Sequence, residues 1–149
     1  MRTLTAFIIV AGLSIGGAFA EKKLALKDLP PEAQKTIQAE LKGAEIKNIG
    51  KETEKGVTQY EVETMLNGKH RDFNVDTKGK LLVVEEETSL DAIPAAAKTA
   101  ILKKVGTGKL SMVELFMRGG ETMYEAAYTT AGGKKREVLV KADGTETKD

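Results

Sequence analysis

The chain contains no cysteine and no tryptophan, and His70 is the single histidine among its 149 residues. A chain without cysteine has no disulfides, so its fold must be held together by its core alone. The lack of thiols also excludes a cysteine nucleophile and a zinc–thiolate centre. Because only one imidazole is present, most kinds of transition-metal site are excluded as well.

The sequence has no excess of either charge, since 23 Lys and Arg residues stand against 22 Asp and Glu residues. Proteins that bind nucleic acids concentrate basic residues, because phosphate contacts supply most of the affinity. The balance of charge therefore indicates no nucleic-acid partner. For the same reason, an anionic membrane surface is not expected as a partner.

Long hydrophobic runs are absent except near the N-terminus. Arg2 precedes an apolar run over residues 4–18, and Ala18-Phe19-Ala20 forms a small-residue cleavage site. This pattern predicts a secretory signal peptide over residues 1–20. A membrane anchor is the alternative, but the run is short for a bilayer span of about 20 apolar residues. A lipoprotein anchor is excluded because no cysteine follows. The prediction is a periplasmic or secreted protein with no membrane span after cleavage.

An internal repeat occupies the chain after the predicted leader. Residues 26–37 (LKDLPPEAQKTI) correspond to residues 90–101 (LDAIPAAAKTAI) at a shift of 64 positions. The same shift superimposes Pro30 on Pro94, Tyr60 on Tyr124, and Gly68 on Gly132. One additional residue then makes the shift 65, which places Gly79 on Gly144. Self-similarity of this kind predicts two structural repeats, one over residues 24–87 and one over residues 88–149.

Each repeat combines a helical pattern with strand patterns. Ala33, Ile37 and Leu41 recur every fourth residue, which predicts one apolar helix face, and the second copy has the same spacing. The segments after each helix alternate between apolar and polar residues, as half-buried antiparallel strands do. The second copy leaves only residues 145–149 for a fourth strand. The fold class is therefore α+β: tandem α-β-β-β(-β) repeats, with helices packed on one face of an antiparallel sheet of seven or eight strands.

Residues 110–117 (LSMVELFM) are apolar on both sides of a predicted strand. Core packing on both faces is the preferred interpretation, because apolar runs are most often buried. The alternative is an exposed apolar patch, formed either by Leu115 and Met117 or by Met112 and Phe116.

Candidate chemistry is sparse. His70 lies near the tip of a predicted hairpin, and no nucleophile or orienting partner can be named for it. The acidic run 85–87 cannot converge on a cation, because consecutive strand residues point to opposite faces. Residues 76–79 and Asp143-Gly144 resemble pieces of a calcium loop but lack its ligand series. No catalytic residue, metal ligand or cofactor is predicted.

One surface remains as a candidate binding site. Tyr60 and Val62 are predicted to face the helix, so the residues that alternate with them along the strand face the other side of the sheet. The partner-binding residues predicted on that exposed face are Gln59, Glu61, Glu63, Met65, Met123 and Glu125. Neighbouring carboxylates can perform acid–base catalysis, but a half-buried sheet produces the same pattern. The interpretation we prefer is a broad surface that binds a protein partner.

The motifs in this chain resemble those of a known family. The pattern Leu-x-x-Leu-Pro-x-x-Ala-x-x-x-Ile (residues 26–37), the triplet at residues 60–62 and Asp-x-x-Gly (residues 76–79) stand in tandem behind a leader. This arrangement is similar to that of PepSY-like proteins, which also resemble beta-lactamase inhibitory protein. The resemblance implies small exported modules that restrain proteases or sense signals outside the cytoplasm. In the inhibitor, the concave sheet face binds the target, and no catalytic residue is carried over.

The function predicted from the sequence is a non-enzymatic, exported PepSY-like binding module with a protein partner in the cell envelope. The resemblance implies that it inhibits a protease or another hydrolase through its exposed sheet face. The alternative is an extracytoplasmic sensor that binds a small ligand or a cation between the repeats. A hydrolytic enzyme is the third hypothesis, and no set of catalytic residues supports it.

Overall fold

The computed structural model describes residues 24–147, so the predicted leader over residues 1–20 lies outside the described residues. The described part begins with a short 3-10 helix, Leu26–Asp28. The subsequent helices and strands are α1 (Pro31–Leu41), β1 (Glu45–Glu54), β2 (Val57–Leu66), β3 (Lys69–Asp76), β4 (Leu81–Thr88), α2 (Ala95–Val105), β5 (Lys109–Arg118), β6 (Glu121–Thr129), β7 (Lys135–Val140) and β8 (Glu146–Thr147).

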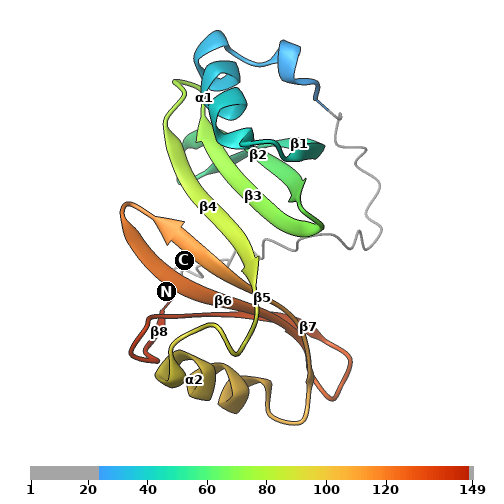
Figure 1. Cartoon of the computed structure of the whole chain (residues 1–149), viewed down its shortest axis with the longest axis vertical. Coiled ribbons are helices and arrows are strands. Elements are labelled where there is room, and N and C mark those ends of the chain that lie inside the picture. The colour runs from blue at the N-terminus through green and yellow to red at the C-terminus, as the bar shows by residue number, and fades with distance from the viewer. Residues whose placement is uncertain (1–23, 148–149) are drawn as a thin grey trace. The chain divides into compact units, whose positions relative to one another are not determined.

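The described residues divide into two compact units. The N-terminal unit contains residues 24–87 together with 116–121, and the C-terminal unit contains residues 88–115 together with 122–147. Figure 1 shows α1 lying against strands of the N-terminal unit and α2 lying against strands of the C-terminal unit. Each unit therefore has its own helix and its own helix–sheet core.

The eight strands form an antiparallel sheet in which they are arranged in sequence order, from β1 to β8. The α+β fold class predicted from the sequence is confirmed, and the sheet has eight strands. β8 is much shorter than β4, since it has two residues where β4 has eight. The sequence left open whether the second copy has a fourth strand. The structure has a short one, β8, which pairs with Leu139 and Val140 of β7.

A proline directly precedes each helix. Pro30 and Pro94 are the N-cap residues of α1 and α2, and their extended backbones lead directly into the first turns. Proline suits this position because the first N–H groups of a helix have no intrahelical acceptor. At the other end, α1 is followed by Lys42 with a φ of 48° and α2 by Gly106 with a φ of 56°. These left-handed residues end the helices.

The core of each unit lies between its helix and one face of its strands. In the N-terminal unit, Ala33 and Ile37 of α1 pack in one cluster with Val62, Phe73 and Val75, all of which have 0% exposure. The alternation of the strands produces this face, since Val62 of β2 pairs directly with Phe73 of β3.

In the C-terminal unit, Ala97 and Ile101 of α2 pack with Ala126, Val138 and Val140. At two of these positions the side chains are smaller than in the first unit, since Ala126 and Val138 stand where the first unit has Val62 and Phe73.

The apolar segment 110–117 is buried at several positions, as its preferred interpretation predicted. Val113 is 4% exposed and packs in the core beneath α2, whereas Phe116 has 0% exposure and lies on the opposite side of the strand by alternation. Met112, Leu115 and Met117 are half-buried. The segment thus does not present the exposed apolar patch that was the alternative.

Candidate functional site

The sheet face turned away from α1 is the candidate site. Tyr60 and Val62 lie in the core beneath α1, so the residues that alternate with them point to the other side. We call the polar residues on this side of β1–β4 the polar face, namely Asn48, Glu52, Gln59, Glu61, Glu63, Asp72, Asn74 and Glu85. Five of these eight side chains are carboxylates, and they share the side with Met65, His70 and Val83.

Amide groups hold two of these carboxylates in place. The Gln59 amide donates a 2.6 Å hydrogen bond to Oε1 of Glu52, and the Asn74 amide donates a 3.1 Å bond to the same oxygen. The Asn48 amide donates to Oε1 of Glu63 at 3.1 Å. Since these bonds join different strands, they fix the orientation of the carboxylates before any partner binds, which lowers the entropic cost of binding.

Asp72 lies near the centre of the polar face and is only 4% exposed. Its Oδ1 accepts a 2.7 Å hydrogen bond from the backbone N–H of Thr64. Burial raises the pKa of Asp72 above its ordinary value, and the charge of Glu63 raises it further, whereas the Thr64 N–H and His70 act in the opposite direction. The polar face therefore contains a carboxylate that is poorly solvated and has an acid as its neighbour.

Two of the predicted contact residues are not exposed, and this part of the prediction is wrong. Gln59 is 4% exposed because it lies on β2 between β1 and β3 and its amide is bonded to Glu52. Met123 is 8% exposed, as expected for an apolar side chain on a strand with neighbours on both sides.

The other predicted contact residues are half-buried, namely Glu61, Glu63, Met65 and Glu125. The structure brings Gln59, Glu61, Glu63 and Met65 together on one side of β2. Met123 and Glu125 belong to β6 in the C-terminal unit. The sequence prediction missed Asn48, Asp72 and Asn74, although the alternation around Phe73 and Val75 already placed Asp72 and Asn74 on the polar side.

The corresponding face of the C-terminal unit is less acidic. Glu125 pairs with Leu139, and Glu137 pairs with Ala127. Burial raises the pKa of Glu137 from 4.5 to about 7. At the 65-residue shift Glu137 corresponds to Asp72, so each unit carries one acid with a raised pKa at the same position of its third strand.

The raised pKa of Glu137 predicts a specific dependence of stability on pH. Between the ordinary value of 4.5 and about 7, the folded chain keeps a proton that the unfolded chain releases, so stability falls as pH rises through this window. Replacing Glu137 by Gln removes the titration. We expect E137Q to raise the melting temperature at about pH 8 and to change it little at about pH 4, where the carboxyl of the wild type is protonated in both states. If the melting temperatures of E137Q and of the exposed control E121Q change with pH in the same way, the raised pKa of Glu137 is contradicted.

His70 does not form a catalytic arrangement. It pairs with Met65 across the strands, and its backbone N–H donates a 3.0 Å bond to Oε2 of Glu87. In the part of the chain that the structure describes, no group of three or more His, Asp or Glu side chains is arranged to hold a metal ion. The same residues include no helix that is long and apolar enough to cross a membrane.

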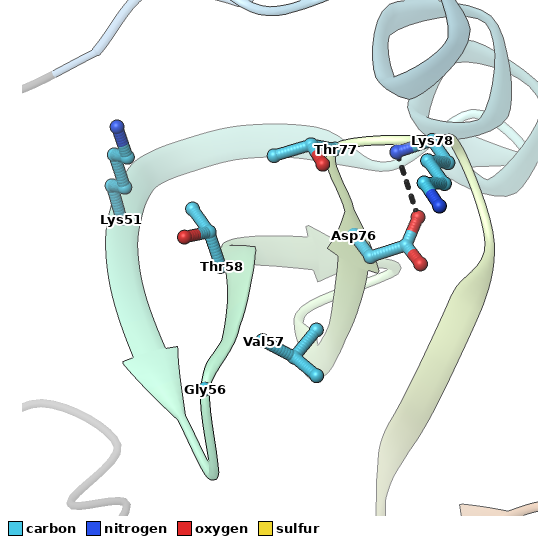
Figure 2. Close-up of a pocket in the computed structure, with 7 residues that line it drawn as sticks. All are labelled: Lys51, Gly56, Val57, Thr58, Asp76, Thr77 and Lys78. Carbon is cyan, nitrogen blue, oxygen red and sulfur yellow. Dashed lines mark hydrogen bonds between the residues drawn. The ribbon is translucent and has the colours of Figure 1, made fainter.

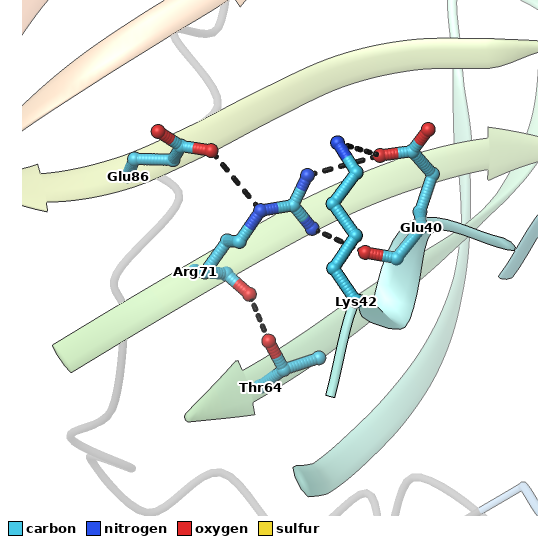
Figure 3. A network of polar contacts seen from close by, with 5 residues as sticks. All are labelled: Glu40, Lys42, Thr64, Arg71 and Glu86. Atoms are coloured by element: carbon cyan, nitrogen blue, oxygen red, sulfur yellow. Dashed lines mark hydrogen bonds and ion pairs between the residues drawn. The ribbon is translucent and has the colours of Figure 1, made fainter. Parts of the chain in front are cut away.

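Buried Arg71 forms an ion-pair network with Glu40 and Glu86 on the helix side of the sheet (Figure 3). Its guanidinium donates to the backbone oxygen of Glu40 at 2.7 Å, to Oε2 of Glu40 at 2.9 Å and to Oε1 of Glu86 at 3.0 Å. Partial burial raises the pKa of Glu40, but the hydrogen bond from Arg71 and the charge of Lys42 outweigh it, so the pKa lies below its ordinary value. This network ties the last turn of α1 to β3 and β4.

A hollow of about 510 Å³ lies beside the turns that come after β1 and β3 (Figure 2). Figure 2 shows Lys51 and Lys78 on opposite sides of it, with Val57 and Thr58 between them. The backbone N–H of Lys78 donates to Oδ1 of Asp76, which is a turn contact. Because the lining side chains do not converge on one point, the hollow is a weaker candidate than the polar face.

No protein-family model matches the chain, and no curated protein is similar to it. Solved structures do match. A protein from Bacteroides eggerthii described as periplasmic superimposes with a TM-score of 0.64 at 15% identity, covering 80% of this chain and 86% of that one. A DUF2874 family protein from Bacteroides ovatus gives 0.61 at 14% identity, with 80% and 85% covered.

A third match is a BLIP-like protein from Bacteroides fragilis, named for its likeness to beta-lactamase inhibitory protein. It superimposes with a TM-score of 0.52 at 23% identity, covering 76% of this chain and 82% of that one. At such identities the similarity concerns the fold. The chain therefore has a BLIP-like fold, as its sequence motifs had indicated.

Proposed function

We propose that this protein is a non-enzymatic binding module of the periplasm or the secreted fraction, and that its polar face contacts a protein partner. The observation that carries this proposal is the set of amide hydrogen bonds across β1–β3, which holds the half-buried carboxylates Glu52 and Glu63 in fixed orientations on one sheet face. Half-buried Glu61, Glu63 and Met65 provide the contact surface above it. Polar groups that are already oriented give a partner specificity at low entropic cost.

A neighbour's compartment supports export. The B. eggerthii neighbour is described as periplasmic, the compartment to which the predicted leader would direct this chain.

We propose that residues 24–87 and 88–149 are PepSY-like repeats. In support, a Cβ added at Gly79 would meet the backbone oxygen of Glu32 at 2.5 Å, and one at Gly144 would meet that of Ala96 at 2.8 Å. The pairs Gly79/Gly144 and Glu32/Ala96 are related by shifts of 65 and 64.

The finer proposal is that the partner is a protease or another hydrolase that the module inhibits. It rests on the BLIP-like fold, since the beta-lactamase inhibitor binds its target through a sheet face, and on the resemblance to PepSY-like proteins, which restrain proteases. No enzymatic role is proposed for the chain itself. Turnover of a hydrolase substrate by the purified protein, lost in H70A, would contradict this proposal.

The binding role is tested by affinity capture from an envelope extract, with the full chain produced with its own leader as bait. We expect E61K/E125K to lose the specific partner, because two carboxylates of the predicted contact set become basic, while the melting temperature changes by only a few degrees. The matched control is E32K/E146K, which reverses two exposed carboxylates on the helix side of the two units, one on α1 and one on β8, and should retain the partner. A partner that E61K/E125K retains would refute the assignment of this face.

A further inference from the structure

β1 is the first strand of the sheet, so one of its edges has no neighbouring strand in the described part of the chain. A two-residue turn joins β1 to β2, and both of its residues, Lys55 and Gly56, have positive φ. Residues that flank such a turn exchange backbone hydrogen bonds, and along an antiparallel pair these bonds occur at every second residue. The backbone groups of residues 50, 52 and 54 therefore point to β2, whereas those of Ile49, Lys51 and Thr53 point away from it.

A separate backbone bond agrees with this alternation. The N–H of Leu24 donates to the Ile49 carbonyl at 3.4 Å, so this carbonyl does point away from β2. The first half of β1 is further protected by a bulge, a device that hinders the addition of strands. The second half has a regular register, and within the described residues no backbone group bonds to the outward N–H and C=O groups of Lys51 and Thr53. We call Lys51 and Thr53 the free edge.

Positive charge lies beside the free edge. Lys51 pairs with buried Tyr60, so its exposed side chain is on the helix side of the sheet. There it lines the hollow of Figure 2 together with Lys78, and neither ammonium group forms an ion pair within the described residues. Asp76 is the acid among the lining residues, and its Oδ1 accepts two backbone N–H groups of its own turn. The free edge thus has two lysines nearby whose charges are not paired.

These lysines are particular to the first unit. The shifts of 64 and 65 that relate the two copies place Leu115 at the position of Lys51 and Asp143 at that of Lys78. The second copy forms the same kind of hairpin without either charge. The shared fold therefore does not require the two lysines.

A second copy of the chain fits the free edge poorly. Two β1 strands related by a two-fold axis would run antiparallel. Pairing Lys51 with its own copy places two ammonium groups opposite each other, and pairing Lys51 with Thr53 of the copy places Glu52 opposite Glu52. Like charges at opposite strand positions are unfavourable, so the edge favours a strand of different sequence.

We propose that the free edge receives an extended segment of the partner protein, which adds a strand to β1 and places an acidic side chain beside Lys51. The backbone of such a segment bonds to the outward N–H and C=O groups of the edge, and side chains next to it provide specificity. The residue opposite Lys51 lies on the helix side of the sheet, where a carboxylate pairs with one lysine and is attracted by the other. This inference rests on the proposed function for the presence of a protein partner, but the edge is separate from the polar face.

The probes are three short capped peptides of alternating valine and threonine, with a central glutamate, glutamine or lysine. Amide hydrogen exchange and backbone amide shifts of the full chain are followed while each peptide is added. In the free chain, we expect the amides of Lys51 and Thr53 to exchange at least about tenfold faster than those of Gly50 and Glu52, because only the latter donate to β2. The glutamate peptide should slow the two outward amides at least about fivefold at saturation and bind about threefold more tightly than the glutamine peptide.

Two variants separate the charge from the backbone. K51E should reverse the preference, so that the lysine peptide binds more tightly than the glutamate peptide. T53P removes one outward N–H but no bond to β2, so it should weaken the glutamate peptide at least about fivefold. If T53P does not fold, K51E still tests the proposal. The matched control is K109E, which reverses an exposed lysine at the start of β5 and should bind the peptides as the wild type does.

A bound peptide that leaves the exchange of Lys51 and Thr53 unchanged would overturn the proposal, as would an unaltered preference in K51E. Slow exchange of both amides in the free chain would also overturn it, assigning the edge to a second copy if the chain is a dimer and to the chain itself if it is a monomer. Affinity capture separates this inference from the proposed function. A partner that E61K/E125K loses but K51E and T53P retain would refute the edge and leave the polar face intact. Peptide binding at the edge without any captured partner would support the edge and count against the binding role of the polar face.

Discussion

Replacing Arg71 by methionine is expected to lower the free energy of unfolding by about 3 kcal/mol or more. The guanidinium side chain is 5% exposed and donates to three oxygens of Glu40 and Glu86. Methionine fills similar space but donates nothing, so the Glu40 carbonyl in the last turn of α1 loses its partner. The cation also lies 5.5 Å from the ring centre of Phe73, and this attraction is lost with it.

The chain provides a matched control for this substitution. Arg136 occupies the corresponding position of β7, at a shift of 65, but it is exposed, and its Nη1 donates to the neighbouring Lys135 carbonyl. R136M should change the free energy of unfolding by less than about 0.5 kcal/mol, as exposed substitutions usually do. Urea unfolding of both variants measures the difference. If R71M costs no more than R136M, the buried network does not stabilise the unit.

The ion pair also has a defined pH dependence. The pKa of Glu40 is lower in the folded chain than its ordinary value, so the pair stabilises the fold above that ordinary value. The stabilisation is lost as pH falls through the folded pKa, because Glu40 is then protonated in both states. The difference in free energy of unfolding between the wild type and R71M should therefore become smaller at low pH. Urea unfolding of both proteins at several pH values measures this difference.

The sequence predicted the elements of the fold better than their polar contacts. The helix stripe of Ala33 and Ile37 and the alternation of β2 depend on local spacing, and both appear in the core as expected. The network of Arg71 was not predicted, because Glu40 is 31 residues away and reaches it only once α1 lies across the strands. Periodicity determines which face a side chain occupies, but not which partner it finds there.

The same distinction holds for the candidate site. Glu61 and Glu63 were predicted on the face opposite the helix, and alternation alone places them there. The burial of Gln59 was missed, because it depends on Glu52 of the neighbouring strand, seven residues away. Asp72 was missed for a different reason. Alternation around buried Phe73 and Val75 turns Asp72 outward, but only the pairing of β2 with β3 shows that it lies beside Glu63.

Replacing Gly79 by alanine is expected to lower the free energy of unfolding by about 2–4 kcal/mol. Gly79 has a φ of 80°, and an added Cβ would lie 2.5 Å from the backbone oxygen of Glu32 and 3.1 Å from Oγ1 of Thr36. Since Glu32 is in the first turn of α1, relieving this contact requires the helix to move away from its core. The Thr36 hydroxyl, which donates to the Gly79 carbonyl at 2.6 Å, would lose its bond as well.

Gly68 separates the two causes of this cost. It has the same φ of 80°, but a Cβ added there would meet no atom within 4 Å. G68A therefore carries only the penalty of the left-handed backbone, roughly 1 kcal/mol, and any larger loss in G79A measures the contact with α1. Equal losses in thermal or urea unfolding would show that α1 adapts at no cost. A larger loss in G79A would show that the contact with Gly79 positions α1. A similarly large loss in G144A, whose added Cβ would meet the backbone oxygen of Ala96 in α2, would show that α2 is positioned by the equivalent glycine contact, as tandem repeats require.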